Sequence, residues 1–168
     1  MNKFDYGKPA EVRQEIRNRY ARHLEWLNDN RVGEPFDVST LDMRDLEDVL
    51  TGLDLRDSIL LGLYGPHAML QGINFEGADM SRVYLKDAVL EGSNLTDVVL
   101  EGADLRGVDM RGVVLKGANL RRADFDGANM AGCVLGDADI DGAFINYPGF
   151  DITPFVRDPR TGLCVCDH

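Results

Sequence analysis

The chain is poor in the residues that usually mark catalytic, metal-binding or membrane proteins. Its 168 residues include three histidines, three cysteines and one tryptophan. It lacks an uninterrupted apolar run of the ~18 residues that a membrane-spanning helix needs. The start, MNKFDYGKPAEVRQ, lacks the apolar stretch of a signal peptide. We therefore expect no membrane span and no export, and a cytoplasmic location is the default expectation.

Positive charge is also scarce. Lys and Arg total 18 against 29 Asp and Glu, which gives a formal net charge of −11. A chain this acidic has no basic field to attract phosphates, so direct binding to nucleic acid or to anionic membranes is not expected. The basic residues that exist gather locally in the second half of the chain, at Arg106, Arg111, Lys116, Arg121 and Arg122.

No recognisable catalytic set is present. His23, His67 and His168 lie far apart in the sequence, and none belongs to a nucleophile–base pattern. The 18 glycines do not form a phosphate-binding loop, because they recur at a fixed spacing. We therefore predict a protein that is not an enzyme, with no catalytic residues, no cofactor and no bound metal.

What the chain does have is a period of five. In GADLRGVDMRGVVLKGANL, residues 102–120, a large apolar residue falls at every fifth position. A helix requires spacings of three and four and a strand requires two, so neither explains it. Residues 53–147 divide into 19 such units with the pattern A-(D/N)-L-x-G, and only Gly65 interrupts the central apolar position. The expected core ladder includes Leu85, Leu90, Leu95, Leu100, Leu105, Met110, Leu115, Leu120, Phe125, Met130 and Leu135.

Three less regular units precede this run, at 36–40, 41–45 and 48–52, with Leu46 and Glu47 as a two-residue insertion. A solenoid with four sides explains the period, because each unit then forms one short side and one corner. Four units make a coil, and coils stack at the strand spacing of roughly 4.8 Å. One coil alone would be unstable, since its backbone groups pair only with neighbouring coils.

The pattern resembles the pentapeptide-repeat family, strongly over 53–147 and loosely over 36–52. The resemblance implies an all-β solenoid, a right-handed quadrilateral β-helix of about five coils. It implies little about function, since the family includes gyrase-binding proteins, effectors and many members without an assigned role.

The two ends depart from the repeat. Residues 1–35 are expected to form an N-terminal cap with a helix at about 9–29, because a solenoid needs its terminal coil covered. The stretch HLEWLNDNRVGE also resembles a segment that precedes the repeats in many bacterial and phage members. The repeat domain spans 36–147. Residues 148–168 are Pro-rich and irregular, and would serve as a cap or contact another subunit.

The C-terminal CVCDH leaves three interpretations open for Cys164 and Cys166. They could be reduced bystanders, inter-chain disulfides or, together with His168, metal ligands. A bridge between the two would close a small, strained ring, and a zinc site would lack a fourth ligand. Cys133 replaces an inward Ala or Val and is expected to be a buried small hydrophobe.

Outward positions that are apolar are candidate contact surfaces. Tyr64, Tyr84, Met69 and Val89 should cluster at one corner, and Val99, Val114 and Val134 should mark the opposite side. The N-terminal helix could cover the first cluster. The valines are harder to cover from within the chain, so they are the better candidate for a subunit contact.

Two functions follow as hypotheses. The first is a rigid module that self-associates or joins a larger assembly, conceivably one of phage origin or a virion component. The second is an acidic DNA mimic that binds a type II topoisomerase such as gyrase. The negative charge is compatible with the second, whereas the short stack and the central basic cluster favour the first.

Overall fold

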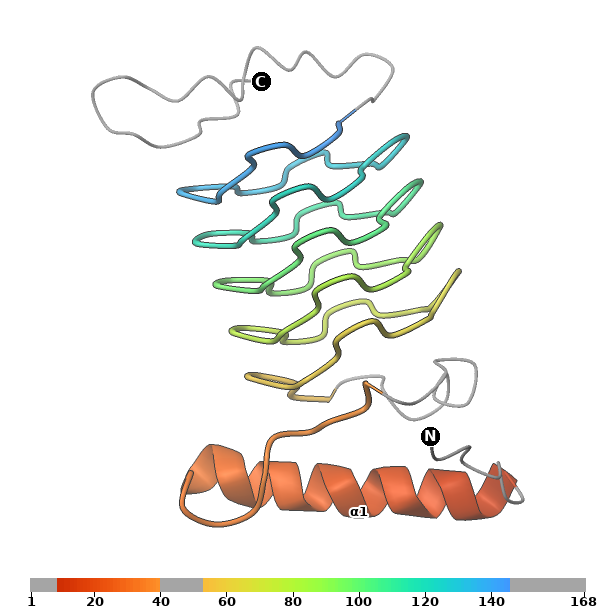
Figure 1. Cartoon of the computed structure of the whole chain (residues 1–168), viewed down its shortest axis with the longest axis vertical. Coiled ribbons are helices and arrows are strands. Elements are labelled where there is room, and N and C mark those ends of the chain that lie inside the picture. The colour runs from red at the N-terminus through yellow and green to blue at the C-terminus, as the bar shows by residue number, and fades with distance from the viewer. Residues whose placement is uncertain (1–8, 40–52, 146–168) are drawn as a thin grey trace.

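The computed structural model describes residues 9–39 and 53–145. Residues 53–145 form a stack of four-sided coils, a right-handed β-helix solenoid (Figure 1). The single named element is the helix α1, Pro9–Asn28, which lies across the N-terminal end of this stack. The helix ends one residue before the expected boundary. The expected domain boundaries at 35/36 and 147/148 stay predictions.

Parallel single-residue β-bridges hold the coils together. In residues 53–145 each bridge joins positions 20 apart, as in Asp54 with Asn74 and Asn74 with Asn94. In the units from Leu55 to Phe125 the central N–H donates to the coil above, as from Leu105 to the Asp124 carbonyl at 2.8 Å. The preceding N–H donates to the coil below, as from Asp104 to the Val83 carbonyl at 2.9 Å. These two bonds need a neighbouring coil, which makes the stack cooperative.

Each unit ends in a tight turn. The Val108 N–H donates to the Leu105 carbonyl at 3.2 Å, and Gly107 at the third turn position has a φ of 67°. Type II turns require this positive φ at that position, which is why glycine recurs there. Asp87 occupies the equivalent corner one coil earlier, and its carboxylate lies where a Cβ on Gly107 would be. At this corner the Asp87 side chain therefore leaves no room for a side chain at position 107.

The interior is filled by the central ladder and by small residues two positions earlier. All eleven residues of the expected ladder are at most 4% exposed. Cys133 is also buried, and its Sγ lies 3.0 Å from the Met110 carbonyl oxygen, to which it donates. The core therefore runs continuously along the solenoid axis.

The cap supplies hydrogen bonds to the open edge of the first coil. Arg19 donates from Nη1 to the Asp37 carbonyl at 3.0 Å, and the Tyr20 hydroxyl accepts from the Asp54 N–H at 3.0 Å. Asp37 bridges Ile59, a separation of 22 residues, so this coil contains two residues more than the others. Their predicted position at Leu46 and Glu47 lies outside the described residues.

Replacing Leu105 with Lys tests the five-residue register. Leu105 is fully buried in mid-stack, so the variant would bury an unpaired charge and should fail to fold. Leu61→Lys is the matched control, because Leu61 is 44% exposed and should tolerate the charge. Circular dichroism melts compare the two. A soluble Leu105→Lys protein that melts cooperatively near the wild-type temperature would contradict this register.

Candidate interaction surfaces

The outward position before each central residue divides into two chemical classes. Between 54 and 144, ten of these positions are Asp or Asn, and each accepts a hydrogen bond at Oδ1 from the backbone N–H two residues later, at 3.0–3.4 Å. This is the Asx-turn contact, which satisfies an N–H at the corner. The recurrent Asp and Asn are therefore explained by the backbone of their own unit.

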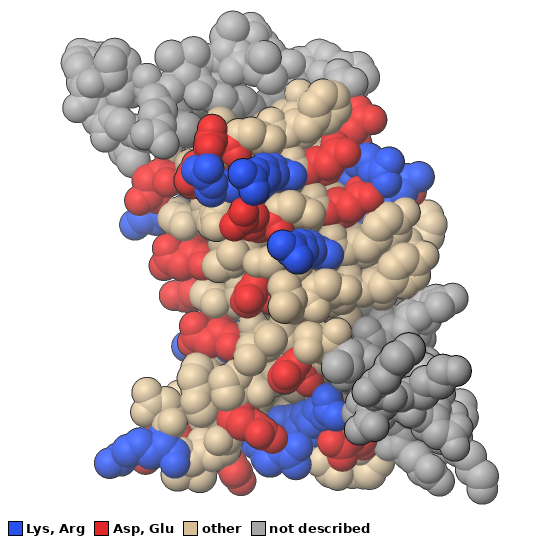
Figure 2. Space-filling model, viewed as in Figure 1, with Lys and Arg blue, Asp and Glu red and all other residues tan. Residues whose placement is uncertain are grey.

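Arginines neutralise several of these carboxylates locally. Arg106 binds Asp104 at 2.5 Å, and Arg111 binds Asp109 at 2.8 Å. The hydrogen bond from the Arg106 side chain holds the pKa of the Asp104 carboxyl below its usual value. Arg121 pairs with Asp141 at 2.6 Å. Figure 2 shows basic side chains beside acidic ones in the upper part of this face, whereas acidic side chains follow one another along its left edge.

The other nine outward positions are large and apolar. They make no Asx contact, so the backbone of the unit does not require these residue types. β-branched and aromatic side chains suit an extended bridge, but several of these are also well exposed. The nine are Ile59, Tyr64, Met69, Tyr84, Val89, Val99, Val114, Val134 and Phe144.

The four residues of the first predicted cluster lie in two bridged pairs, and their role as an interaction surface stays a prediction. Tyr64 and Tyr84 bridge and stack with ring centroids 5.0 Å apart, and Met69 bridges Val89 on the adjoining side. Met69 is 54% exposed. The alternative in which the N-terminal helix covers this corner is wrong, because α1 lies across the end of the stack instead (Figure 1).

The predicted valine cluster occupies two adjoining sides. Val114 and Val134 are bridged on neighbouring coils, and Val99 bridges Asn119 on the next side. Val134 is 53% exposed, whereas Val99 and Val114 are half-buried. These outward side chains on neighbouring coils form an apolar strip that crosses the corner between the two sides, and its role as a contact surface stays a prediction.

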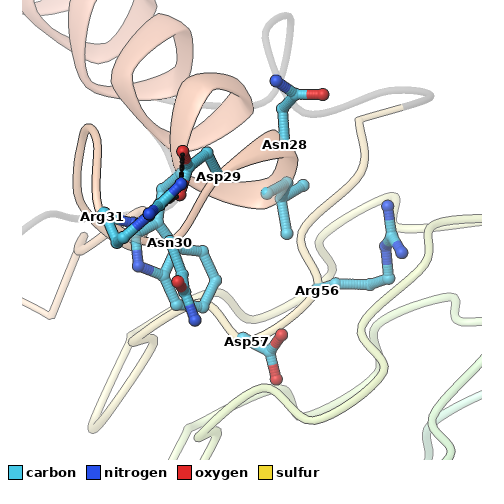
Figure 3. A pocket seen from close by; sticks show the side chains of 8 residues that line it. Asn28, Asp29, Asn30, Arg31, Arg56 and Asp57 are labelled. Carbon is cyan, nitrogen blue, oxygen red and sulfur yellow. Dashed lines mark hydrogen bonds and ion pairs between the residues drawn. The ribbon is translucent and has the colours of Figure 1, made fainter.

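A hollow of about 540 Å³ lies between the end of α1 and the first coil (Figure 3). Residues 26–31 line one side of it, and Arg56 and Asp57 line the other. Its two arginines are already paired, Arg31 with Asp29 and Arg56 with Asp54. Since no uncompensated cation and no buried polar group converge here, we assign it no ligand.

The described residues contain no group of three or more His, Cys, Asp or Glu side chains that could hold a metal ion. His67 lies at an exposed corner. His23 belongs to α1 and is fully buried. Cys164, Cys166 and His168 lie outside the described residues, so all three interpretations of CVCDH stay open. In 9–39 and 53–145, no helix is long and apolar enough to cross a membrane.

Sequence reasoning missed two features. The Asx contacts were readable in principle, since Asp or Asn two residues before a corner N–H is a known turn pattern. The paired hydrogen bonds of His23 had no sequence signal, because their partners are backbone groups of Phe36 and Asp54.

Removing one Asx acceptor should cost measurable stability. Asn119→Ala leaves the Arg121 N–H without its 3.1 Å partner and should lower the free energy of unfolding by about 1 kcal/mol. In a domain of this size the melting temperature should fall by roughly 2–4 °C. Asn119→Asp retains an Oδ1 acceptor and serves as the control. Equal melting temperatures for Asn119→Ala and wild type would show that this contact contributes nothing.

Comparison with known proteins identifies the repeat. The family model described as pentapeptide repeats matches residues 67–97 and 109–146 with eight copies. A search of the curated proteins found no match. A pentapeptide-repeat protein from Nostoc PCC 7120 is 29% identical with a TM-score of 0.55, covering 71% of this chain and 93% of that chain.

Two further solved structures are similar over part of the chain. A pentapeptide-repeat protein from the thylakoid lumen of Arabidopsis thaliana is 26% identical with a TM-score of 0.41, and covers 58% of this chain. The match spans 64% of the Arabidopsis protein, less than two thirds of its length. QnrB1, a plasmid-mediated fluoroquinolone resistance protein, is 16% identical over 52% of this chain and 62% of that one, with a TM-score of 0.31. The repeat matches and the coils of 20 residues together show that this chain carries pentapeptide repeats, and it is similar to solved pentapeptide-repeat proteins.

Proposed function

We propose that this chain is a non-enzymatic protein-interaction scaffold whose apolar side strip, Val99, Val114 and Val134, contacts a second copy. The observation that carries the proposal is the division of the outward positions. The ten Asp and Asn residues cap their own units, whereas the apolar nine have no such local role. Apolar residues exposed on neighbouring coils commonly mark a protein contact.

The architecture supports a scaffold over an enzyme. The solenoid interior is filled by ladder residues, and the hollow beside α1 is lined by arginines that are already paired. What the rod offers a partner is a rigid array of side chains, spaced by the coil repeat. We place this scaffold in the cytoplasm, with a phage particle as the alternative location.

The DNA-mimic alternative is not favoured by a specific observation. In the basic cluster that the sequence places mid-chain, the four arginines each lie within 4 Å of a carboxylate. These pairs break up the continuous negative surface that a mimic of the DNA backbone would need. Inhibition of gyrase supercoiling at low micromolar protein is the measurement that would revive this alternative.

Val134→Asp tests the proposed contact. The new carboxylate stands where ten other units carry Asp or Asn, so the coil should still fold. It also places a charge in the apolar strip, and burying that charge in a contact would be costly. We expect light scattering after size exclusion to show a defined oligomer for the wild type and a smaller mass for Val134→Asp.

Asn129→Asp is the matched control, because it adds the same charge on another side and keeps the Asx acceptor. Its mass should equal that of the wild type. Each sample is run with and without reductant, which separates the strip from the terminal cysteines. A monomeric wild type, or an oligomer unchanged by Val134→Asp, would remove this contact from the account.

A further inference from the structure

The N-terminal end of the solenoid is closed by side chains of one face of α1. Ile16 packs in the core, and Arg19, Tyr20 and His23 bind backbone groups of the first coil. His23 is the only one of these polar groups that is fully buried, and it is a histidine, which can change its charge near neutral pH. The hydrogen bonds of His23 therefore determine how the docking of α1 depends on pH.

Those two hydrogen bonds allow one protonation state. The Phe36 N–H donates to Nδ1 at 3.1 Å, so Nδ1 must present its lone pair. Nε2 lies 3.0 Å from the Asp54 carbonyl oxygen, which can only accept, so Nε2 carries the proton. Neutral His23 satisfies both groups. A second proton, on Nδ1, would point at the Phe36 N–H and remove that bond.

The surroundings of His23 act on a positive charge in both directions: burial and Arg56 oppose it, and Asp54 and Asp57 favour it. The rings of Tyr20 and Phe36 lie about 6 Å away, and the Trp26 ring stacks on the imidazole at 6.1 Å. Among the described residues, the charged groups that act on it, Asp54, Arg56 and Asp57, come from the first coil. Arg56 binds the Asp54 carboxylate at 2.7 Å and itself opposes a positive imidazole, so the carboxylate favours the imidazolium only in part.

We propose that α1 is a proton-sensitive latch: neutral His23 docks it on the first coil, and protonation of His23 in mild acid releases it. This step goes beyond the scaffold role and does not depend on the valine strip. Release would expose the backbone groups of Phe36, Asp37 and Asp54 that α1 now binds. These groups form an open parallel edge, which is a template for pairing with another strand.

The direction of the pH effect follows from the docked state. Burial lowers the pKa of His23 from its ordinary value of 6.5, and the hydrogen bond to the Asp54 carbonyl and the carboxylates of Asp54 and Asp57 offset this only partly. The released state, with an ordinary pKa, therefore binds more protons than the docked state in mild acid. Docking should be at full strength above pH 6.5, and should weaken as pH falls from 6.5 towards the lowered value.

Hydrogen–deuterium exchange tests the latch in the full-length chain. The reference is His67→Asn/His168→Asn, which leaves His23 as the sole histidine, and Asn suits the positive φ at position 67. We expect protection factors of α1 amides, corrected for intrinsic exchange, to fall between pH 7.5 and 5.5, by at most about tenfold. Amides in mid-stack should keep their protection. Trp26, the sole tryptophan, reports the same step by fluorescence.

His23→Gln in the same background removes the titrating group. Its α1 protection should no longer depend on pH in this range, whether the helix stays docked or is released throughout. Two results would overturn the proposal. One is α1 protection in the reference that stays constant down to pH 5.5, and the other is an equal loss of protection in His23→Gln.

Discussion

The parallel hydrogen bonds between residues of neighbouring coils are the constraint on which the whole structure depends. Within a five-residue unit the backbone makes only a turn bond, so the N–H and C=O groups of its extended residues find their partners in the coils above and below. Once this pairing is fixed at 20 residues, every position has a constant environment along the stack. The central residue points inward, the preceding one points outward, and the corner takes a positive φ.

The surface chemistry follows from that register. An outward Asp or Asn finds a corner N–H two residues ahead, so it stabilises its own unit regardless of its neighbours. Much of the negative charge of the rod is therefore a consequence of turn chemistry, and arginines such as Arg106 and Arg111 offset part of it. Turn chemistry does not explain the exposed apolar positions, so these are the part of the surface that the repeat does not dictate.

The sequence was sufficient for the features that repeat. The period of five predicted the buried ladder, and the capping helix expected at about 9–29 agrees with α1 within one residue. It was insufficient where the partner of a side chain is a backbone group. The contacts of Arg19, Tyr20 and His23 depend on where α1 crosses the first coil, which no residue pattern states. Because α1 crosses the end of the stack, the prediction that the helix covers Tyr64 and Met69 is wrong.

The most direct test of the account is hydroxyl-radical footprinting of the native chain at low and high concentration, read residue by residue by mass spectrometry. If the valine strip is a contact between copies, Val134 should be oxidised less at high concentration. Met69, equally exposed on the opposite corner, should keep a constant rate. Oxidation of Val134 that does not change with concentration would contradict the account.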